Sequence, residues 1–236
     1  MKWSGFDPRH YWSEERGLTS LLVFSLVYLF VICALTNFSF ADKVADLFFA
    51  LIIVAGVLTT FKQRWVRFFA ISLAVASLSI IFEQSLYPGG PLAIVDLLLK
   101  LIFIGLLLAV LIVQVFKSGP VTAHRIRGAI VVYLLLGGAW GLLYRLIHLT
   151  TPHAFHLAAG VAATNPESLQ RLLDYFSFIT LTTTGFGDIT PTNPLTRTLA
   201  MFEALAGQLY LVITLARLVS LAVICPPGPG SHDVQE

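Results

Sequence analysis

The chain has 236 residues, of which 57% are hydrophobic and only 12% are charged, and its mean hydropathy is +0.83. The charged fraction is about half that of a soluble domain, so this composition excludes a protein with one aqueous core and predicts a membrane protein surrounded by lipid. A formal net charge of +2 gives no indication of a nucleic-acid partner, and no small-molecule substrate is evident. No cleavable secretory signal is evident either, since the first apolar run is long enough to span a bilayer.

Six apolar segments approach the roughly 20 residues that a helix needs to cross a bilayer. A shorter, more polar segment, Ser168–Thr182, lies between the last two and is expected to form a re-entrant helix. The predicted fold class is therefore an all-α membrane protein with six transmembrane helices plus one re-entrant helix and the loop after it. The expected spans are Leu18–Leu35, Val44–Thr60, Trp65–Phe82, Pro91–Phe116, Gly128–Leu149 and Leu195–Val223.

Basic residues are concentrated in the second and fourth connections between these spans. The third connection, residues 83–90, contains no Lys or Arg, and the first contains only Lys43. The positive-inside rule then predicts a multi-pass protein with both termini in the cytoplasm and the re-entrant loop on the outer side. The basic residues of the two connections are Lys62, Arg64 and Arg67, and Lys117, Arg125 and Arg127.

The loop after the re-entrant helix reads Thr-Thr-Thr-Gly-Phe-Gly-Asp over residues 182–188. Glycines at alternate positions permit backbone angles that are closed to other residues, so that successive carbonyls can point the same way. Rings of such carbonyls from four chains can replace the hydration shell of K⁺. We expect K⁺ ligands from the Thr183 hydroxyl and from the carbonyls of Thr183, Thr184, Gly185 and Phe186. Asp188 is expected to draw cations to the outer mouth of this selectivity filter, and Phe186 to pack against the helix behind it. The ion-binding filter residues are Thr183, Thr184, Gly185, Phe186 and Gly187.

This motif resembles the selectivity filter of potassium channels, usually Thr-Val-Gly-Tyr-Gly-Asp, and departs from it at Thr184 and Phe186. The chain from Arg125 to Val223 resembles prokaryotic one-pore potassium channels. The resemblance implies a potassium-selective channel of the bacterial plasma membrane that conducts K⁺ passively, with no cofactor beyond the permeant ion. One filter motif per chain implies three further copies of the same chain in a homotetrameric pore.

The resemblance also divides the chain into four parts. Residues 1–17 form a cytoplasmic N-terminal segment, 18–118 a four-helix bundle similar to a voltage sensor, 119–224 the pore domain, and 225–236 a disordered tail. A voltage sensor needs several basic residues at every third position of its fourth helix. Here Lys100 is the only one, and Asp96 is placed to pair with it at spacing i, i+4. We expect weak or no voltage sensing. Asp46 and Glu83 are alternative partners for Lys100.

Gly207 lies about 20 residues after Gly187, where inner helices of potassium channels commonly carry a hinge glycine. It is interpreted either as a gating hinge or as a point of close helix packing, and the two are not exclusive. Gln208 and Thr214 are expected either to face the cavity below the filter or to bond to a neighbouring helix. Asp174 is expected either to brace the filter through a hydrogen bond or to sit on a polar face near the outer mouth.

Three histidines, His148, His153 and His156, fall in the outer segment before the re-entrant helix. They are interpreted as solvated loop residues, with an external proton sensor as the alternative. His153 and His156 share a metal only if that stretch is helical. Cys33 and Cys225 are expected at opposite ends of the membrane, which excludes a disulfide between them.

An enzyme finds little support, because the intramembrane polar residues do not form a paired-carboxylate, nucleophile–base or metal-ligand set. A secondary transporter is a weaker alternative, with Asp96, Lys100 and Glu203 as a proton relay, but no inverted repeat is present. A non-selective cation channel keeps the same fold and changes only the filter.

Overall fold

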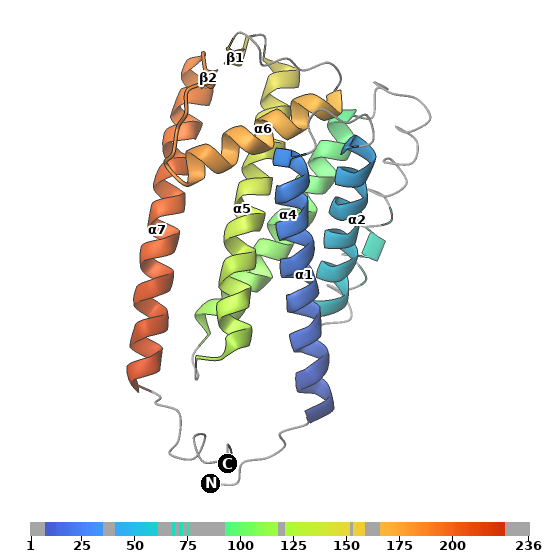
Figure 1. The fold of residues 1–236 in the computed structure, drawn as a ribbon, viewed down its shortest axis with the longest axis vertical. Coiled ribbons are helices and arrows are strands. Elements are labelled where there is room, and N and C mark those ends of the chain that lie inside the picture. Colours follow the sequence, from blue (N-terminus) through green and yellow to red (C-terminus); the bar gives the residue numbers. More distant parts are fainter. Residues whose placement is uncertain are drawn as a thin grey trace.

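The computed structural model describes residues 8–34, 41–60, 68, 71–72, 75, 93–117, 121–151, 153–158 and 166–224. These residues form long helices and one small two-stranded sheet (Figure 1). The elements in chain order are α1 (Pro8–Ala34), α2 (Ala41–Thr60), α4 (Ala93–Phe116), α5 (Ala123–Thr150), β1 (Phe155–Leu157), α6 (Pro166–Leu181), β2 (Ile189–Pro191) and α7 (Pro194–Ile224).

The long helices run side by side, and α6 crosses them obliquely near one end of the molecule (Figure 1). The first residues of α1 and the last residues of α7 lie at the opposite end, away from β1 and β2. The helix α6 contacts α5, α7 and α1, while α1 also packs against α2 and α5. The short helix is therefore held among the long ones, and the loop that follows it emerges near the end that carries the sheet.

Local sequence explains where the helices around α6 begin. Thr122 caps α5 because its hydroxyl accepts a hydrogen bond from the Arg125 N–H at 3.3 Å. Asn193 caps α7 in the same way, with its side-chain oxygen 2.8 Å from the Thr196 nitrogen. Proline follows this cap at the first position of α7 and also opens α6, where its missing N–H is no loss.

The observed bounds agree with the expected segments to within three residues except at the starts of α1 and α5 and in the third span; α5 begins at Ala123 rather than Gly128. The helix α1 begins at Pro8 rather than Leu18, so it includes part of the segment 1–17. The tail 225–236 lies outside the described residues. The expected span Trp65–Phe82 also lies outside them, apart from four helical positions. The four positions are Phe68, Ile71, Ser72 and Val75.

Within the described ranges, three helices are long and apolar enough to cross a membrane: Ile94–Phe116, Ala123–Thr150 and Pro194–Leu221. The apolar part of α1, Gly17–Phe30, is shorter. The protein is therefore a mostly helical membrane protein with at least these three candidate spans, and the layout of six spans stays an expectation.

An apolar core joins α1, α2, α4 and α5, and one ion pair lies inside it. Lys100 Nζ is 2.6 Å from Asp96 Oδ2, and both side chains are buried. The Lys100 ammonium also lies 5.4 Å from the centroid of the Phe49 ring. The expected pairing of Lys100 with Asp96 is confirmed. The alternative partners, the Asp46 side chain and Glu83, lie outside the described residues.

This pair leads to a prediction about voltage sensing. We expect Lys100→Gln to lower the midpoint of thermal unfolding clearly, because the change leaves Asp96 buried without its partner, at a cost of roughly 3–5 kcal/mol. The double variant Lys100→Gln/Asp96→Asn removes both charges and should recover most of that loss. Conductance measured against voltage should keep the same shallow slope in all three proteins. A steep wild-type curve that Lys100→Gln flattens would contradict a purely structural pair.

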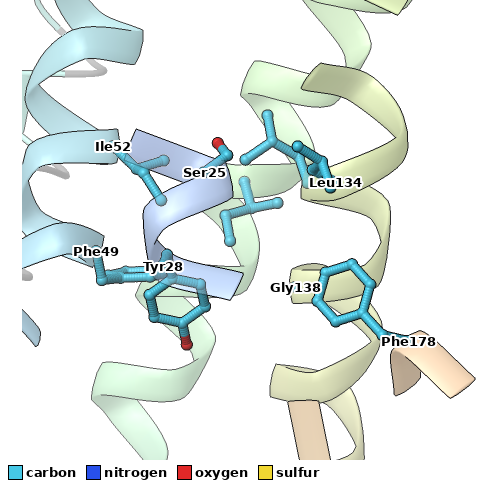
Figure 2. A pocket seen from close by; sticks show the side chains of 9 residues that line it. Ser25, Tyr28, Phe49, Ile52, Leu134, Gly138 and Phe178 are labelled. Carbon is cyan, nitrogen blue, oxygen red and sulfur yellow. The ribbon is translucent and has the colours of Figure 1, made fainter. Parts of the chain in front are cut away.

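A small apolar pocket lies where the first helices meet α5 and α6. Figure 2 shows the ring of Phe178, from α6, on one side of it and the side chains of Tyr28 and Phe49 on the other. The Ser25 hydroxyl at its edge donates to the Leu21 carbonyl at 2.8 Å, so it adds no free polar group. At this pocket the first helices thus meet α6 through apolar side chains.

Candidate functional site

The helix α6, which was expected to be re-entrant, ends in a hydrogen-bonded cap from which the loop begins. The Thr184 N–H donates to the Ile179 carbonyl at 2.8 Å, and the Thr183 N–H donates to the Thr180 carbonyl at 2.9 Å. Thr183 itself has φ 58°. These two bonds around one left-handed residue form a Schellman motif, which satisfies the last carbonyls of a helix. The cap therefore fixes how the loop leaves α6.

Threonine is an unusual residue for this position, which glycine normally occupies. A β-branched residue in the left-handed region is a steric outlier, and the conformation costs roughly 1–2 kcal/mol. The Thr183 hydroxyl accepts a hydrogen bond at 3.3 Å from Nε2 of Gln208 on α7. The strained position therefore presents a hydroxyl group that a glycine would lack, which points to a functional reason for the threonine.

We expect Thr183→Gly to raise the midpoint of thermal unfolding, by about 1 kcal/mol of stability, because glycine adopts this backbone conformation without strain. The same change should impair ion selectivity, since it removes the hydroxyl at the inner end of the loop. Thr183→Ser keeps the hydroxyl and is the matched control, so it should retain more selectivity than the glycine variant. Equal selectivity in the glycine and serine variants, measured as permeability ratios, would show that the Thr183 hydroxyl does not contribute to selectivity.

The backbone of the loop alternates in conformation. Thr183, Gly185 and Gly187 have φ of 58°, 54° and 82°, whereas Thr184 and Phe186 between them do not have positive φ. Only glycine adopts positive φ freely, so the two glycines stand where the backbone requires them. No neighbouring atom lies within 4 Å of a Cβ built on Gly185 or Gly187. Backbone conformation, rather than space within this chain, therefore explains both glycines.

The loop is bare in the single chain. Residues 182–187 are all exposed, and the Phe186 side chain is 70% exposed. The expectation that Phe186 packs against the helix behind the filter is therefore wrong for its own chain, because α6 leaves the ring uncovered. The described residues therefore leave this ring largely exposed.

Thr184 is tied back toward α6. Its hydroxyl oxygen lies 2.9 Å from that of Thr182, and the Thr182 hydroxyl donates to the Phe178 carbonyl at 2.7 Å. Since Thr182 has a single hydroxyl hydrogen, Thr184 must be the donor in the contact between the two hydroxyls. The Thr184 side chain thus points back toward the end of α6. Its backbone is part of residues 183–187, in which positive and negative φ alternate.

A two-stranded sheet, formed by β1 before α6 and β2 after the loop, holds the end of the loop that lies away from α6. β1 pairs with β2 in antiparallel register, with Phe155 opposite Pro191 and Leu157 opposite Ile189. The Ala158 N–H donates to the Asp188 carbonyl at 2.9 Å. The Asp188 side chain, partly buried, accepts a bond from the Ile189 N–H at 3.1 Å. The outer segment before α6 therefore anchors the chain immediately after the loop.

Of the three histidines before α6, His148 lies in the last turn of α5, so its interpretation as a loop residue is wrong, whereas the other two are not helical. His156 lies in β1 and His153 in the turn before it, so the helical spacing on which a shared metal depended is wrong. No group of three metal-binding side chains is present in the part of the chain that the structure describes. His153 and His156 are exposed, whereas His148 is partly buried at the end of α5 and stacks on Phe155.

Asp174 is buried in α6, with 1% of its surface exposed. Its two carboxylate oxygens accept hydrogen bonds from Tyr28 of α1 and from Gln170, both at 2.6 Å. A Cβ on Gly141 of α5 would lie only 3.0 Å from the Asp174 Cα, so Gly141 makes room for this residue. Both earlier interpretations are wrong in detail, because Asp174 is neither on a polar face nor bonded to the filter. It ties α6 to α1.

Gly207 lies where α7 passes the end of α6. A Cβ at this position would be 2.9 Å from Leu181 Cδ1, 3.1 Å from the Leu181 carbonyl carbon and closer still to its oxygen. The same oxygen accepts a bond from the Tyr133 hydroxyl at 3.3 Å. The helix α7 continues through Gly207 without a break. The structure therefore supports close packing as the role of Gly207.

The other two residues expected near the cavity differ in their surroundings. Gln208 is exposed and donates a hydrogen bond to the Thr183 hydroxyl at 3.3 Å, so it lies beside the start of the loop. Thr214 is buried, with 7% of its surface exposed, and it does not face open space in this chain.

A buried polar cluster behind α6 was not predicted as a unit. Glu203 of α7 accepts a bond from the Tyr144 hydroxyl at 2.6 Å, and its other oxygen lies 2.5 Å from the Ser177 hydroxyl. The hydrogen bonds of Glu203 thus run to α5 and α6, and Asp96 pairs with Lys100 instead. A relay through Asp96, Lys100 and Glu203 therefore gains no support. In the sequence, the only indication of this cluster is that its polar residues occur singly within apolar segments.

Residues 160–223 match the model of a protein family described as ion channel. The matched region contains α6, the loop and nearly all of α7. No curated protein and no solved structure matches the chain significantly. The match supports the interpretation of this region as part of a pore-loop ion channel in the membrane rather than of an enzyme.

Proposed function

We propose that this protein is a potassium-selective channel whose filter is formed by residues 183–187 from four identical chains. The observation that carries the proposal is the alternation of positive φ at Thr183, Gly185 and Gly187 in an exposed loop. When the backbone alternates in conformation, successive peptide groups can turn the same polar atom to one side. In anion-binding sites these atoms are N–H groups, and in a cation site they are carbonyl oxygens. A ladder of carbonyls made in this way replaces the hydration shell of K⁺.

The exposure of the loop supports a closed ring of chains. Irregular backbone at membrane depth is tolerated only where protein buries it or where it lines a water-filled cavity. Residues 182–187 have no cover in one chain, and neither does the ring of Phe186. Four copies arranged around an axis place the carbonyls toward a wet pore and the Phe186 rings toward protein.

The inner helix supports the same assembly. Only 17% of the apolar stretch of α7 is buried within the chain, compared with 44% of the apolar stretch of α5. A helix that lines a pore meets the other copies and the cavity, so low burial within its own chain is expected. Three further copies of the chain and the surrounding lipid then cover α7. Large exposed side chains on it include Phe202, Leu205, Leu209, Val212 and Leu215.

The proposed channel lies in a cell membrane, of bacterial type by resemblance, with both termini in the cytoplasm. The ends of α1 and α7 at the side opposite the sheet fit this orientation (Figure 1). Asp188 stands at the outer mouth, and Thr183 and Gln208 lie at the cavity end. Lys100 is neutralised by Asp96, so the first bundle is proposed to contribute little or no voltage sensing.

Rubidium uptake into liposomes tests this proposal. Liposomes loaded with K⁺ and carrying the purified full-length chain should accumulate external Rb⁺ tracer, which resembles K⁺ in size, and external K⁺ should compete for entry more strongly than Na⁺. Uptake that Na⁺ and K⁺ suppress equally would replace the proposal with a non-selective cation channel of the same fold. Uptake that requires a gradient of a second ion would indicate a transporter instead.

A further inference from the structure

One hydrogen-bonded cluster joins the three helices that surround the loop. Glu203 of α7 is fully buried, with 0% of its surface exposed, and so is Ser177 of α6. Glu203 Oε2 lies 2.6 Å from the Tyr144 hydroxyl of α5, and Glu203 Oε1 lies 2.5 Å from Ser177 Oγ. Ser177 Oγ also lies 2.7 Å from the carbonyl oxygen of Gly137 on α5.

Counting hydrogens in this cluster determines the state of Glu203. The Gly137 carbonyl can only accept, and Ser177 has a single hydroxyl hydrogen to donate. When that hydrogen goes to Gly137, the 2.5 Å contact between Ser177 and Glu203 needs a second hydrogen, which only the carboxyl group can provide. A neutral Glu203 therefore donates to Ser177, Ser177 donates to Gly137, and Tyr144 donates to Glu203. An ionised Glu203 leaves one of these short contacts without a hydrogen.

The surroundings of Glu203 favour the same state. Among the described residues Glu203 forms no ion pair, and the titratable groups that face it are the Tyr144 and Tyr133 hydroxyls of α5. A buried carboxylate without a cation is strongly disfavoured, whereas a hydrogen-bonded carboxylic acid is not. Neither neighbouring group supplies the missing positive charge.

The cluster is connected to the loop through both α6 and α7. Ser177 lies in the turn before Leu181, and Glu203 lies in the turn before Gly207, which abuts that same Leu181. The Ile179 carbonyl between them accepts the N–H groups of both Thr184 and Gly185, the latter at 3.1 Å. A displacement of α7 relative to Ser177 would therefore move the turn that holds the start of the loop.

We propose that Glu203 is a buried neutral carboxylic acid that positions the filter by joining the inner helix to the re-entrant helix at Ser177. The proposal rests on the proposed channel function. In this role Glu203 touches no permeant ion and acts through Ser177 and the last turn of α6. The loss of one buried hydrogen bond shifts an equilibrium by roughly 2- to 10-fold, which sets the size of the expected effect on the filter.

Infrared spectroscopy tests the protonation state without any ion flux. The difference spectrum of the full-length protein minus Glu203→Gln, at neutral pH in lipid, should contain the carbonyl stretch of a protonated carboxylic acid. A difference spectrum that shows the bands of an ionised carboxylate instead would overturn the proposal. Wild-type protein without ion conduction would refute the proposed channel, but this spectrum would still report on Glu203.

Permeability ratios test the positioning role. Ser177→Ala cuts the link to α6 and should lower the K⁺-over-Na⁺ permeability ratio, or the mean open time, by roughly 2- to 10-fold. Glu203→Gln should stay close to wild type, because its amide can donate to Ser177 and accept from Tyr144. Ser25→Ala, which removes another buried hydroxyl that is bonded to a backbone carbonyl in α1, is the matched control and should change neither quantity. Wild-type values in Ser177→Ala would overturn the positioning role.

Discussion

Gly207→Ala is expected to destabilise the assembled pore. The added methyl group would lie under 3.0 Å from Leu181, against a backbone oxygen that cannot move without shifting the end of α6. Overpacking of this kind costs roughly 1–3 kcal/mol per chain, more than the gain of about 1 kcal/mol that alanine brings to a helix. The midpoint of tetramer dissociation on heating should fall, and a smaller fraction of the protein should assemble.

Gly105→Ala provides the matched control, since this glycine lies inside α4 and a Cβ there meets no atom within 4 Å. It should leave stability unchanged or raise it slightly. A hinge at Gly207 predicts the opposite pattern, in which Gly207→Ala assembles normally and the open probability of single channels falls. Normal melting together with a reduced open probability would contradict the packing role.

Gly185→Ala and Gly187→Ala are expected to abolish or scramble selectivity. Their φ values of 54° and 82° cost an L-residue roughly 1–2 kcal/mol each, and four chains around one axis multiply the effect. The loop should relax to another conformation and turn its carbonyls away from the pore. The permeability ratio of K⁺ over Na⁺ should then approach unity, or conduction should cease.

A D-alanine at position 185 distinguishes the effect of backbone strain from the effect of the added methyl group. D-residues favour positive φ, so this variant, made by semisynthesis, should keep more selectivity than L-alanine at the same place. No atom of the chain lies within 4 Å of an L-alanine Cβ there, so a clash within the chain cannot explain a loss. Unchanged potassium selectivity in the L-alanine variants would contradict the assignment of residues 183–187 as the filter.

Sequence periodicity was sufficient to place the elements around the candidate site. Helix length and apolar composition predicted both ends of α6 and α7 to within two residues. The start of α5 was missed, because the helix continues beyond the apolar segment to the cap at Thr122. The Asp96–Lys100 pair followed from i, i+4 spacing alone. Such local rules need no knowledge of which helices are neighbours.

Contacts between distant segments could not be predicted in this way. The bond from Tyr28 to Asp174 joins residues 146 positions apart, and the one from Tyr144 to Glu203 joins residues 59 apart. Both depend on helix packing that no periodicity specifies. The left-handed Thr183 was also missed, because threonine rarely adopts positive φ and the run of three threonines gives no indication of which one ends the helix.

The reversal potential under bi-ionic conditions tests the central claim most directly. Purified full-length protein is placed in a planar bilayer with K⁺ on one side and an equal concentration of Na⁺ on the other. Single-channel currents should reverse far from zero, at a voltage that opposes the outflow of K⁺, because the carbonyl ladder of residues 183–187 accepts K⁺ and rejects Na⁺. Currents that reverse near zero would contradict a potassium filter.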